Sequence, residues 1–198
     1  MYSQNEEEKV IKDYFKGKTG TFLDVGANDG ITLSNTRALA EEGWSGVCVE
    51  PSPKAFAKLS RLYPKKNGRV YCYPFALGHT NGEIDFWESG EHLNKGDVAL
   101  LSTTISEERE RFPETKYETI KVKCFRWKTF LNRLNIKTFD LISVDTEGME
   151  IIILEQIDLT DVKCVCVEWN GKNKEKFDAL MNGFKLIYTS GENLIYAR

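Results

Sequence analysis

The chain has 198 residues and a formal net charge of −3, and 41% of its residues are hydrophobic. These values exclude a disordered chain and a general attraction to nucleic acids or anionic membranes, and they fit one domain, 1–198, with a substantial core. The acidic start at 1–8 does not resemble a signal peptide, and no apolar run has membrane-spanning length. We therefore expect a cytoplasmic protein with no membrane partner. The composition does not indicate an oligomeric state.

The first part of the chain predicts strands that alternate with helices. In chain order, the expected elements are an N-terminal helix at about 6–16, a strand at 21–26, a helix at 32–42, a strand at 46–50, a helix at 54–62 and a strand at 70–77. Such alternation is typical of parallel strands joined by right-handed crossovers. Asn81-Gly82 then predicts a two-residue hairpin turn before a strand at 84–87.

The polar segment at about 89–119 is weakly patterned, and we expect it to be an insertion that lies over the site. Beyond it, the expected strands are 120–125, 139–145, 162–168, 184–189 and 194–197, and the expected helices are 128–134, 149–157 and 174–181. The five cysteines lie in apolar, strand-like runs and are interpreted as reduced core thiols. The sequence therefore predicts a single α/β domain.

A glycine-containing turn follows the first expected strand, in the run from Asp24 to Gly30. Glycine allows a sharp turn and lets backbone N–H groups approach a ligand closely. The dinucleotide fingerprint GxGxxG would need glycine at 28 and 31, where this chain has Asn28 and Ile31. The turn therefore favours an adenosine ligand without a pyrophosphate over a nicotinamide dinucleotide. A tight turn that binds nothing is the alternative.

Acidic residues end four of the expected parallel strands: Asp24, Glu50, Asp145 and Glu168. Ligands of open parallel sheets bind outside the carboxyl ends of the strands. An acid at the position of Glu50 can accept hydrogen bonds from both hydroxyls of a ribose. The alternative for Glu50 is a solvated acid at the start of a loop. Together, the turn and this acid are more specific than either alone.

Two segments resemble the signatures of the FkbM family of S-adenosylmethionine-dependent methyltransferases. They run from Phe22 to Gly30 (FLDVGANDG) and from Ile142 to Glu150 (ISVDTEGME), and the likeness covers roughly Thr21 to Trp169. The resemblance implies a class I methyltransferase fold, which is a Rossmann-like three-layer sandwich with a mostly parallel seven-stranded sheet and an antiparallel last strand. It also implies O-methylation of a hydroxyl on a sugar or a natural product.

The resemblance further implies that Glu50 holds the ribose of S-adenosyl-L-methionine and that Ala76 lies beside the adenine. With the turn residues added, the candidate cofactor-binding residues are Asp24, Gly26, Ala27, Asn28, Gly30, Glu50, Ala76 and Asp145.

Transfer of a methyl group to a hydroxyl benefits from a base or a metal that takes the proton. The candidate catalytic residues are Asp145, Glu168 and His79. The carboxylates could also share a divalent cation through oxygen ligands, although no metal site is predicted. Glu147 lies just before an expected helix and is interpreted as a capping acid. For His79, a solvated loop histidine is the alternative.

The leading hypothesis is a methyltransferase of the EC 2.1.1 type that acts on a small hydroxyl acceptor, possibly a sugar. A methyltransferase acting on RNA or protein has the same fold, but the acidic balance of the chain argues against a nucleic-acid partner. A nucleoside-binding relative without catalytic activity is a further alternative, which the acids at all four strand ends weaken.

Overall fold

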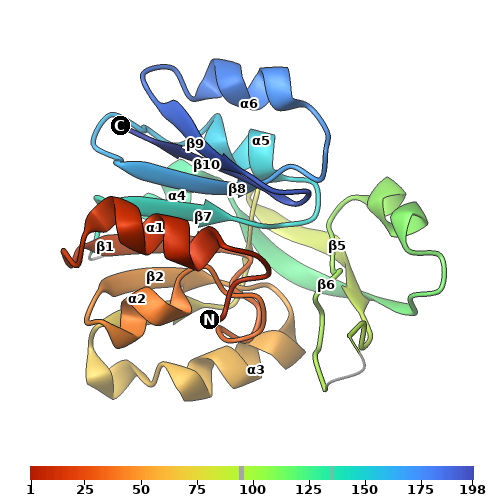
Figure 1. Cartoon of the computed structure of the whole chain (residues 1–198). Coiled ribbons are helices and arrows are strands. Elements are labelled where there is room, and N and C mark those ends of the chain that lie inside the picture. The colour runs from red at the N-terminus through yellow and green to blue at the C-terminus, as the bar shows by residue number, and fades with distance from the viewer. Residues whose placement is uncertain (94–95, 135) are drawn as a thin grey trace.

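The centre of the molecule is a seven-stranded sheet (Figure 1). The computed structural model describes residues 1–93, 96–134 and 136–198. The strands of the main sheet are β1 (Thr21–Val25), β2 (Ser45–Val49), β3 (Val70–Tyr73), β7 (Leu141–Val144), β8 (Cys164–Glu168), β9 (Lys185–Thr189) and β10 (Asn193–Ala197). Their spatial order is β3-β2-β1-β7-β8-β10-β9. The pairs from β3 to β8 are parallel, and β10 is antiparallel to both of its neighbours, which confirms the predicted sheet.

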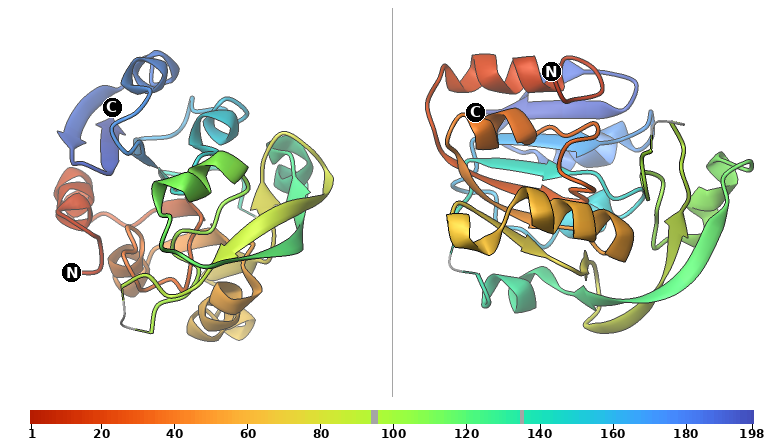
Figure 2. Two further views of the ribbon diagram at one scale, coloured as in Figure 1. Left: turned by 90° about the vertical axis from the view of Figure 1, so that its right-hand side faces the viewer. Right: turned by 90° about the horizontal axis from the view of Figure 1, so that it is seen from below.

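Helices cover both faces of this sheet, so the molecule has three layers (Figure 2). One face carries α1 (Glu7–Phe15), α2 (Arg37–Glu41) and α3 (Pro53–Leu62), and the other carries α4 (Trp127–Leu131), α5 (Glu150–Leu154) and α6 (Lys174–Leu180). Neighbouring residues of β1 point to opposite faces. Phe22 packs in the core with Leu59 of α3, and Leu23 packs in the other core with Ile153 of α5. Both hydrophobic faces of the sheet are thereby buried. In the described ranges, no helix is both long enough and apolar enough to cross a bilayer.

A second, smaller sheet projects from the main body at the right of Figure 1. It consists of β4 (Ala76–Leu77), β5 (Gly82–Ser89) and β6 (Tyr117–Phe125), in the order β4-β6-β5. The residues between β5 and β6 include a 3-10 helix, η2 (Ser106–Arg111), and another short one, η1 (Lys65–Asn67), precedes β3.

Two sequence predictions around this small sheet are wrong. The strand expected at 70–77 is divided at Pro74, with β3 in the main sheet and β4 in the small one, because proline has no N–H to donate to a ladder. The hairpin expected at Asn81-Gly82 is absent, because β5 pairs along its whole length with β6. The hairpin is instead the long one between β5 and β6, with the predicted insertion as its connection.

The second helix is much shorter than the predicted 32–42, because side chains capture the backbone N–H groups of residues before Arg37. The Asp29 carboxylate accepts hydrogen bonds from Ile31 N (2.9 Å) and Thr32 N (2.7 Å). Leu33 has a left-handed backbone, with φ of 55°. Residues 31–36 therefore form a loop at the edge of the sheet, where a helix was expected. All five cysteines are free thiols, and four of them are buried.

Candidate functional site

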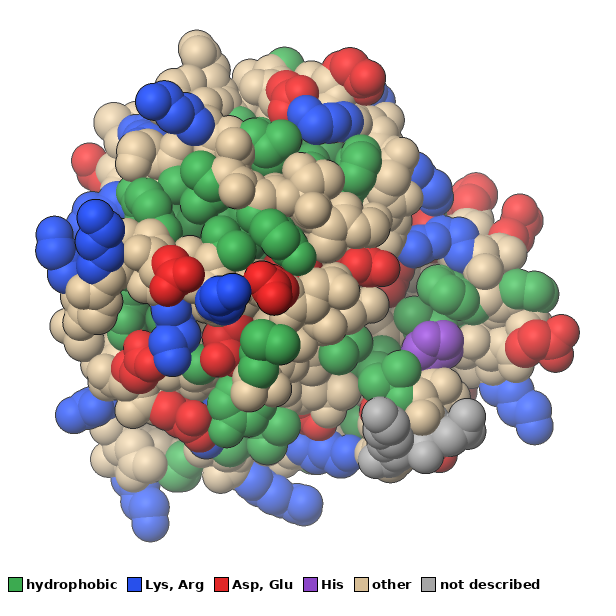
Figure 3. Space-filling model, in the orientation of Figure 1, with side chains coloured by type: hydrophobic (Ala, Val, Ile, Leu, Met, Phe, Trp, Pro, Cys, Tyr) green, Lys and Arg blue, Asp and Glu red, His purple; other side chains and the backbone are tan. Residues whose placement is uncertain are grey.

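A cavity of about 320 Å³ lies where β1, β2, β7 and β8 end. The chain places β2 and β3 on one side of β1 and β7 on the other, so the strand order reverses direction between β1 and β7. Such a switch point opens a crevice at the carboxyl ends of parallel strands. Residues of the connection between β5 and β6 close part of the cavity from outside. Figure 3 shows this face, where acidic side chains lie between the main body and the projecting small sheet.

The glycine turn after β1 forms one wall of this cavity and touches the end of β7. Gly26 has φ of +84°, and its N–H donates to Val49 O at 2.9 Å. A Cβ added to Gly26 would lie only 1.6 Å from the carbonyl oxygen of Asp145. Only glycine therefore fits where the loops after β1 and β7 meet. Asp24, Ala27 and Asn28 also line the cavity.

Two buried carboxylates beside this turn have raised pKa values. Burial raises the pKa of Asp24 to about 6, although its carboxylate accepts a hydrogen bond from Thr36 Oγ1 at 2.6 Å. Burial also raises the pKa of Glu50 to about 7, and that side chain is 4% exposed. Removal from water disfavours the charged form of an acid. Both groups are thus poised to change charge near neutrality.

Glu50 follows β2 directly and is held by two backbone N–H groups. Its Oε2 accepts from Asn28 N at 2.9 Å, and its Oε1 accepts from Ser52 N at 2.7 Å. Ser52 in turn caps α3 through Ala55 N at 3.1 Å. A carboxylate has about four acceptor sites, so both oxygens keep capacity for hydroxyl donors in the cavity. The side chain is therefore oriented before any ligand arrives.

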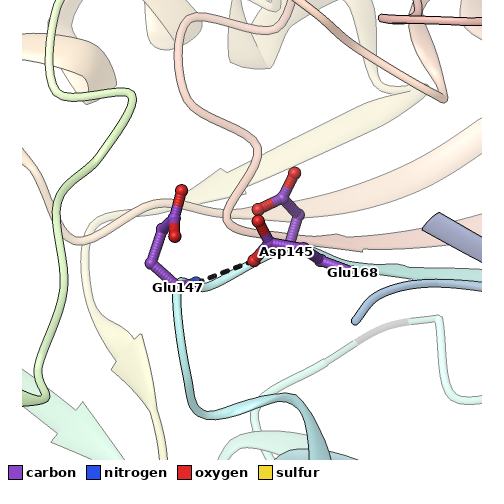
Figure 4. A group of neighbouring side chains, drawn as sticks. All are labelled: Asp145, Glu147 and Glu168. Carbon is purple, nitrogen blue, oxygen red and sulfur yellow. Dashed lines mark hydrogen bonds between the residues drawn. The ribbon is translucent and has the colours of Figure 1, made fainter. Parts of the chain in front are cut away.

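Three further acids gather at the ends of β7 and β8 (Figure 4). Asp145, Glu147 and Glu168 each offer one oxygen, and these atoms lie within 4.8 Å of one another. Glu168 Oε2 accepts from Glu147 N at 3.3 Å. Burial raises the pKa of both Asp145 and Glu168 well above their usual values, and neighbouring carboxylates raise them further. Acids this close do not all ionise, so the group retains a proton near neutral pH.

Glu147 does not cap the helix that follows it. Its backbone is left-handed, with φ of 52°, and its Oε2 accepts from Arg111 Nη1 of η2 at 2.8 Å. Its carbonyl oxygen also accepts from Thr103 Oγ1 at 2.7 Å. Burial raises the pKa of Glu147 to about 8, against the opposing effect of Arg111. Glu150 accepts the N–H groups before α5 instead, so the capping interpretation of Glu147 is wrong.

The three acids have the oxygen donors that a divalent cation prefers. However, the Arg111 guanidinium already compensates Glu147, and Asn170 Nδ2 donates to Glu168 Oε1 at 2.5 Å. These contacts already give Glu147 and Glu168 partners within the protein.

The outer wall of the cavity comes largely from the connection between β5 and β6. His92 and Phe112 line the cavity, and their ring centroids lie 5.5 Å apart in an edge-to-face arrangement. Arg111 lines it as well. His79, by contrast, is exposed and is not among the lining residues, since the chain leaves the sheet edge after β4. Of the other predicted site residues, Ala76 lines the cavity, whereas Gly30 does not.

Sequence reasoning missed several side chains that line the cavity. Arg111 and Asn170 lie in segments without a recognisable pattern, and Asn35 lies where a helix was expected. Their positions depend on how distant segments close over the sheet. Among described residues, the cavity lining contains six carboxylates and one arginine. The carboxylates belong to Asp24, Glu50, Asp145, Glu147, Glu168 and Glu192.

The fold is that of a class I methyltransferase, and the solved structures that resemble this chain include methyltransferases. A methyltransferase FkbM from Methylobacillus flagellatus has a TM-score of 0.56 at 10% identity, with 91% of this chain and 44% of that chain covered. The monomeric form of WbdD has a TM-score of 0.54 at 11% identity, with 98% of this chain and 41% of that chain covered. The chain thus spans less than half the length of either relative. No curated protein matches it. At such identities the likeness establishes the fold.

The family follows from the sequence itself. The model of the methyltransferase FkbM domain matches residues 24–187, which is most of the chain. The chain therefore belongs to the FkbM methyltransferase family, as its two signature segments indicated.

Proposed function

We propose that this protein transfers the methyl group of S-adenosyl-L-methionine to a hydroxyl of a small acceptor, with a sugar as the favoured class. The observation that carries the proposal is the distribution of acids around one cavity. Glu50 lies on one side of the glycine turn, and the pair Asp145 and Glu168 lies on the other. In this arrangement Glu50 would bind the ribose, and the pair on the other side of the turn would be free to act on the acceptor.

The residues fit the cofactor in three respects. Glu50 presents a buried, preoriented carboxylate to two ribose hydroxyls. Gly26 lets the loops after β1 and β7 meet at the cavity wall, and Ala76 offers a small apolar surface for an adenine. Bound there, the cofactor supplies a methyl group on a positively charged sulfur. The neighbouring carboxylates stabilise that positive charge in a site shielded from water.

The protein has two chemical tasks: it positions the acceptor hydroxyl, and it removes one proton from that hydroxyl. Asp145 would take the hydroxyl proton as the acceptor oxygen receives the methyl group. Glu168 offers a carboxylate oxygen within 4.8 Å of one of Asp145 and would share the added proton. The cofactor would supply the methyl group and leave as a neutral sulfide, so charge and protons balance without a further reactant. His79 does not line the cavity and takes no part in the transfer.

The lining of the cavity supports a small, uncharged acceptor. Six carboxylates against one arginine disfavour a phosphate group, which RNA would bring in every nucleotide. Ser102, Thr104 and Asn170 offer hydrogen bonds suited to hydroxyls. The rings of His92 and Phe112 offer an apolar edge for the face of a sugar.

Glu50→Ala should weaken binding of S-adenosylhomocysteine by about 100-fold, because two hydrogen bonds to a buried carboxylate are lost. Wild-type affinity should also fall as the pH is lowered from 8 to 6. The sign follows from the pKa of Glu50, which is about 7: protonation removes the charge that accepts both ribose hydroxyls. Isothermal titration calorimetry across this pH range measures both effects, and the variant should lose most of the pH dependence.

Glu175→Ala provides the matched control, since it removes an exposed acid on α6. It should bind S-adenosylhomocysteine as the wild type does. Wild-type protein that binds neither S-adenosylmethionine nor S-adenosylhomocysteine would contradict the proposed function.

A further inference from the structure

Two thiols face each other at the β3 edge of the main sheet, and neither takes part in the proposed reaction. The edge strand β3 pairs with β2 in parallel, and this pairing places Cys48 in register with Cys72. Register partners on parallel strands point to the same face of a sheet. Cys48 belongs to the hydrophobic core on the face of α1, α2 and α3, and Cys72 packs against that core. The two thiols are therefore direct neighbours.

The two thiols differ in their access to solvent. Cys48 is 1% exposed, whereas Cys72 is half-buried on the outermost strand of the sheet. The adjacent Cys72 thiol and burial together raise the pKa of Cys48 well above its usual value. A thiol that stays protonated reacts slowly with oxidants, because the thiolate is the nucleophile. An oxidant in solution therefore meets Cys72 first, with Cys48 beside it as the second thiol.

We propose that Cys48 and Cys72 form a reversible disulfide that lowers cofactor affinity, an inference that rests on the proposed function. The oxidant is a peroxide. Hydrogen peroxide converts the Cys72 thiol to a sulfenic acid and releases one water. The sulfur of Cys48 then displaces the hydroxyl group, which leaves with the Cys48 proton as a second water. The two thiols lose two electrons and two protons in total, and the peroxide is reduced to two waters.

The spacing of the strands permits this bond at the cost of a local adjustment. Neighbouring strands lie about 4.8 Å apart, and Cα atoms joined by a disulfide lie about 4.4–6.8 Å apart, so the bond is within reach. The Cβ atoms of a disulfide lie only about 3.8 Å apart, so bond formation draws β2 and β3 together at this position. A bond that needs such an adjustment is more easily reduced than a relaxed one, which makes it reversible.

The adjustment occurs two residues before Glu50, the acid that binds the ribose in the proposed function. Glu50 N donates to Tyr73 O at 3.0 Å, and Tyr73 follows Cys72 directly. The backbone of Glu50 therefore depends on the β2–β3 register. On its other side, Cys48 is in register with Asp24, which lines the cavity. Movement at Cys48 is thus transmitted to two acids of the cavity, although neither thiol lines it.

Hydrogen peroxide added to the fully reduced protein should form the Cys48–Cys72 bond. Peptide mapping by mass spectrometry without reductant detects it as a linked peptide pair that has lost two hydrogens. The affinity for S-adenosylhomocysteine, measured by calorimetry, should fall by at least about 10-fold and recover after treatment with dithiothreitol, because the hydrogen bonds of Glu50 are misaligned only in the oxidised form.

Three variants separate the pair from other effects of peroxide. Cys72→Ser should bind S-adenosylhomocysteine within about twofold of reduced wild type and keep that affinity in peroxide. Cys48→Ala should accumulate the Cys72 sulfenic acid, which dimedone labels, without forming the linked peptides. Cys164→Ala is the matched control, since Cys164 is buried in β8 outside the cavity lining. That variant should respond to peroxide as the wild type does.

The possible results distinguish this proposal from the proposed function. If peroxide forms no Cys48–Cys72 bond, or forms it without weakening S-adenosylhomocysteine, the switch is overturned and the proposed function stands. Equal loss of affinity in Cys72→Ser and wild type would also overturn the switch, because peroxide would then act elsewhere. If reduced wild type binds neither S-adenosylmethionine nor S-adenosylhomocysteine, both proposals are overturned.

Discussion

Gly26→Ala should lose measurable binding of S-adenosylhomocysteine and lower the free energy of unfolding by roughly 2–5 kcal/mol, as strain and overpacking add. The added Cβ would lie 1.6 Å from the backbone oxygen of Asp145. A backbone atom, unlike the end of a flexible side chain, cannot rotate out of the way. The loops after β1 and β7 must separate, and both contribute to the cavity. Chemical denaturation and calorimetry measure the two losses.

Gly183→Ala separates crowding from backbone strain. Gly183 has the same φ as Gly26, +84°, but an added Cβ would meet nothing within 4 Å. This variant should lose only about 1–2 kcal/mol, the cost of a left-handed backbone for alanine, and bind the ligand normally. Equal losses in the two variants would show that contact between the β1 and β7 loops has no special importance.

The main sheet could be predicted because its strands are continuous apolar runs buried on both faces. Two such runs extend from Phe22 to Val25 and from Leu141 to Val144. Each indicates a strand independently of the residues around it. Right-handed crossovers then place the ends of parallel strands at one edge. The position of Glu50, Asp145 and Glu168 at this edge could be predicted for the same reason. Their closeness follows from topology alone.

The short-range errors have local causes that compete with hydrophobic periodicity. Helical spacing predicted a helix from residue 32, but Leu33 has a left-handed backbone, with φ of 55°, which a right-handed helix cannot contain. Apolar residues continued through Pro74, yet proline ended the ladder there. In both cases the conformation of one residue outweighed the hydrophobic pattern around it.

The missed parts of the site depend on contacts between distant segments. Arg111 reaches Glu147 only because the long connection between β5 and β6 closes over β7. The outer wall of the cavity is built largely from such residues. Sequence reasoning therefore located the acids at the strand ends better than the residues of the outer wall.

Asp145→Asn should reduce methyl transfer by about 10²- to 10⁴-fold while S-adenosylhomocysteine binds within a few-fold of wild type. An amide has nearly the same shape as the carboxylate but cannot take the hydroxyl proton. Burial and nearby acids raise the pKa of Asp145, so the proton-accepting form becomes more abundant as the pH rises. Wild-type turnover should therefore increase with pH through neutrality, and the residual rate of the variant should not. The measurement is release of S-adenosylhomocysteine with a hydroxylated acceptor found by screening sugars.

Asp140→Asn makes the same chemical change just before the other end of β7. Asp140 accepts from Thr21 N at 2.8 Å and pairs with Lys163 at 2.6 Å, away from the cavity lining. Its loss should cost stability and leave turnover per folded molecule unchanged. Unchanged turnover in Asp145→Asn would remove Asp145 from proton transfer. If Asp145→Asn lost both ligand binding and turnover, Asp145 would be assigned to cofactor binding. A residue that acts only on the acceptor proton should lower turnover without changing ligand binding.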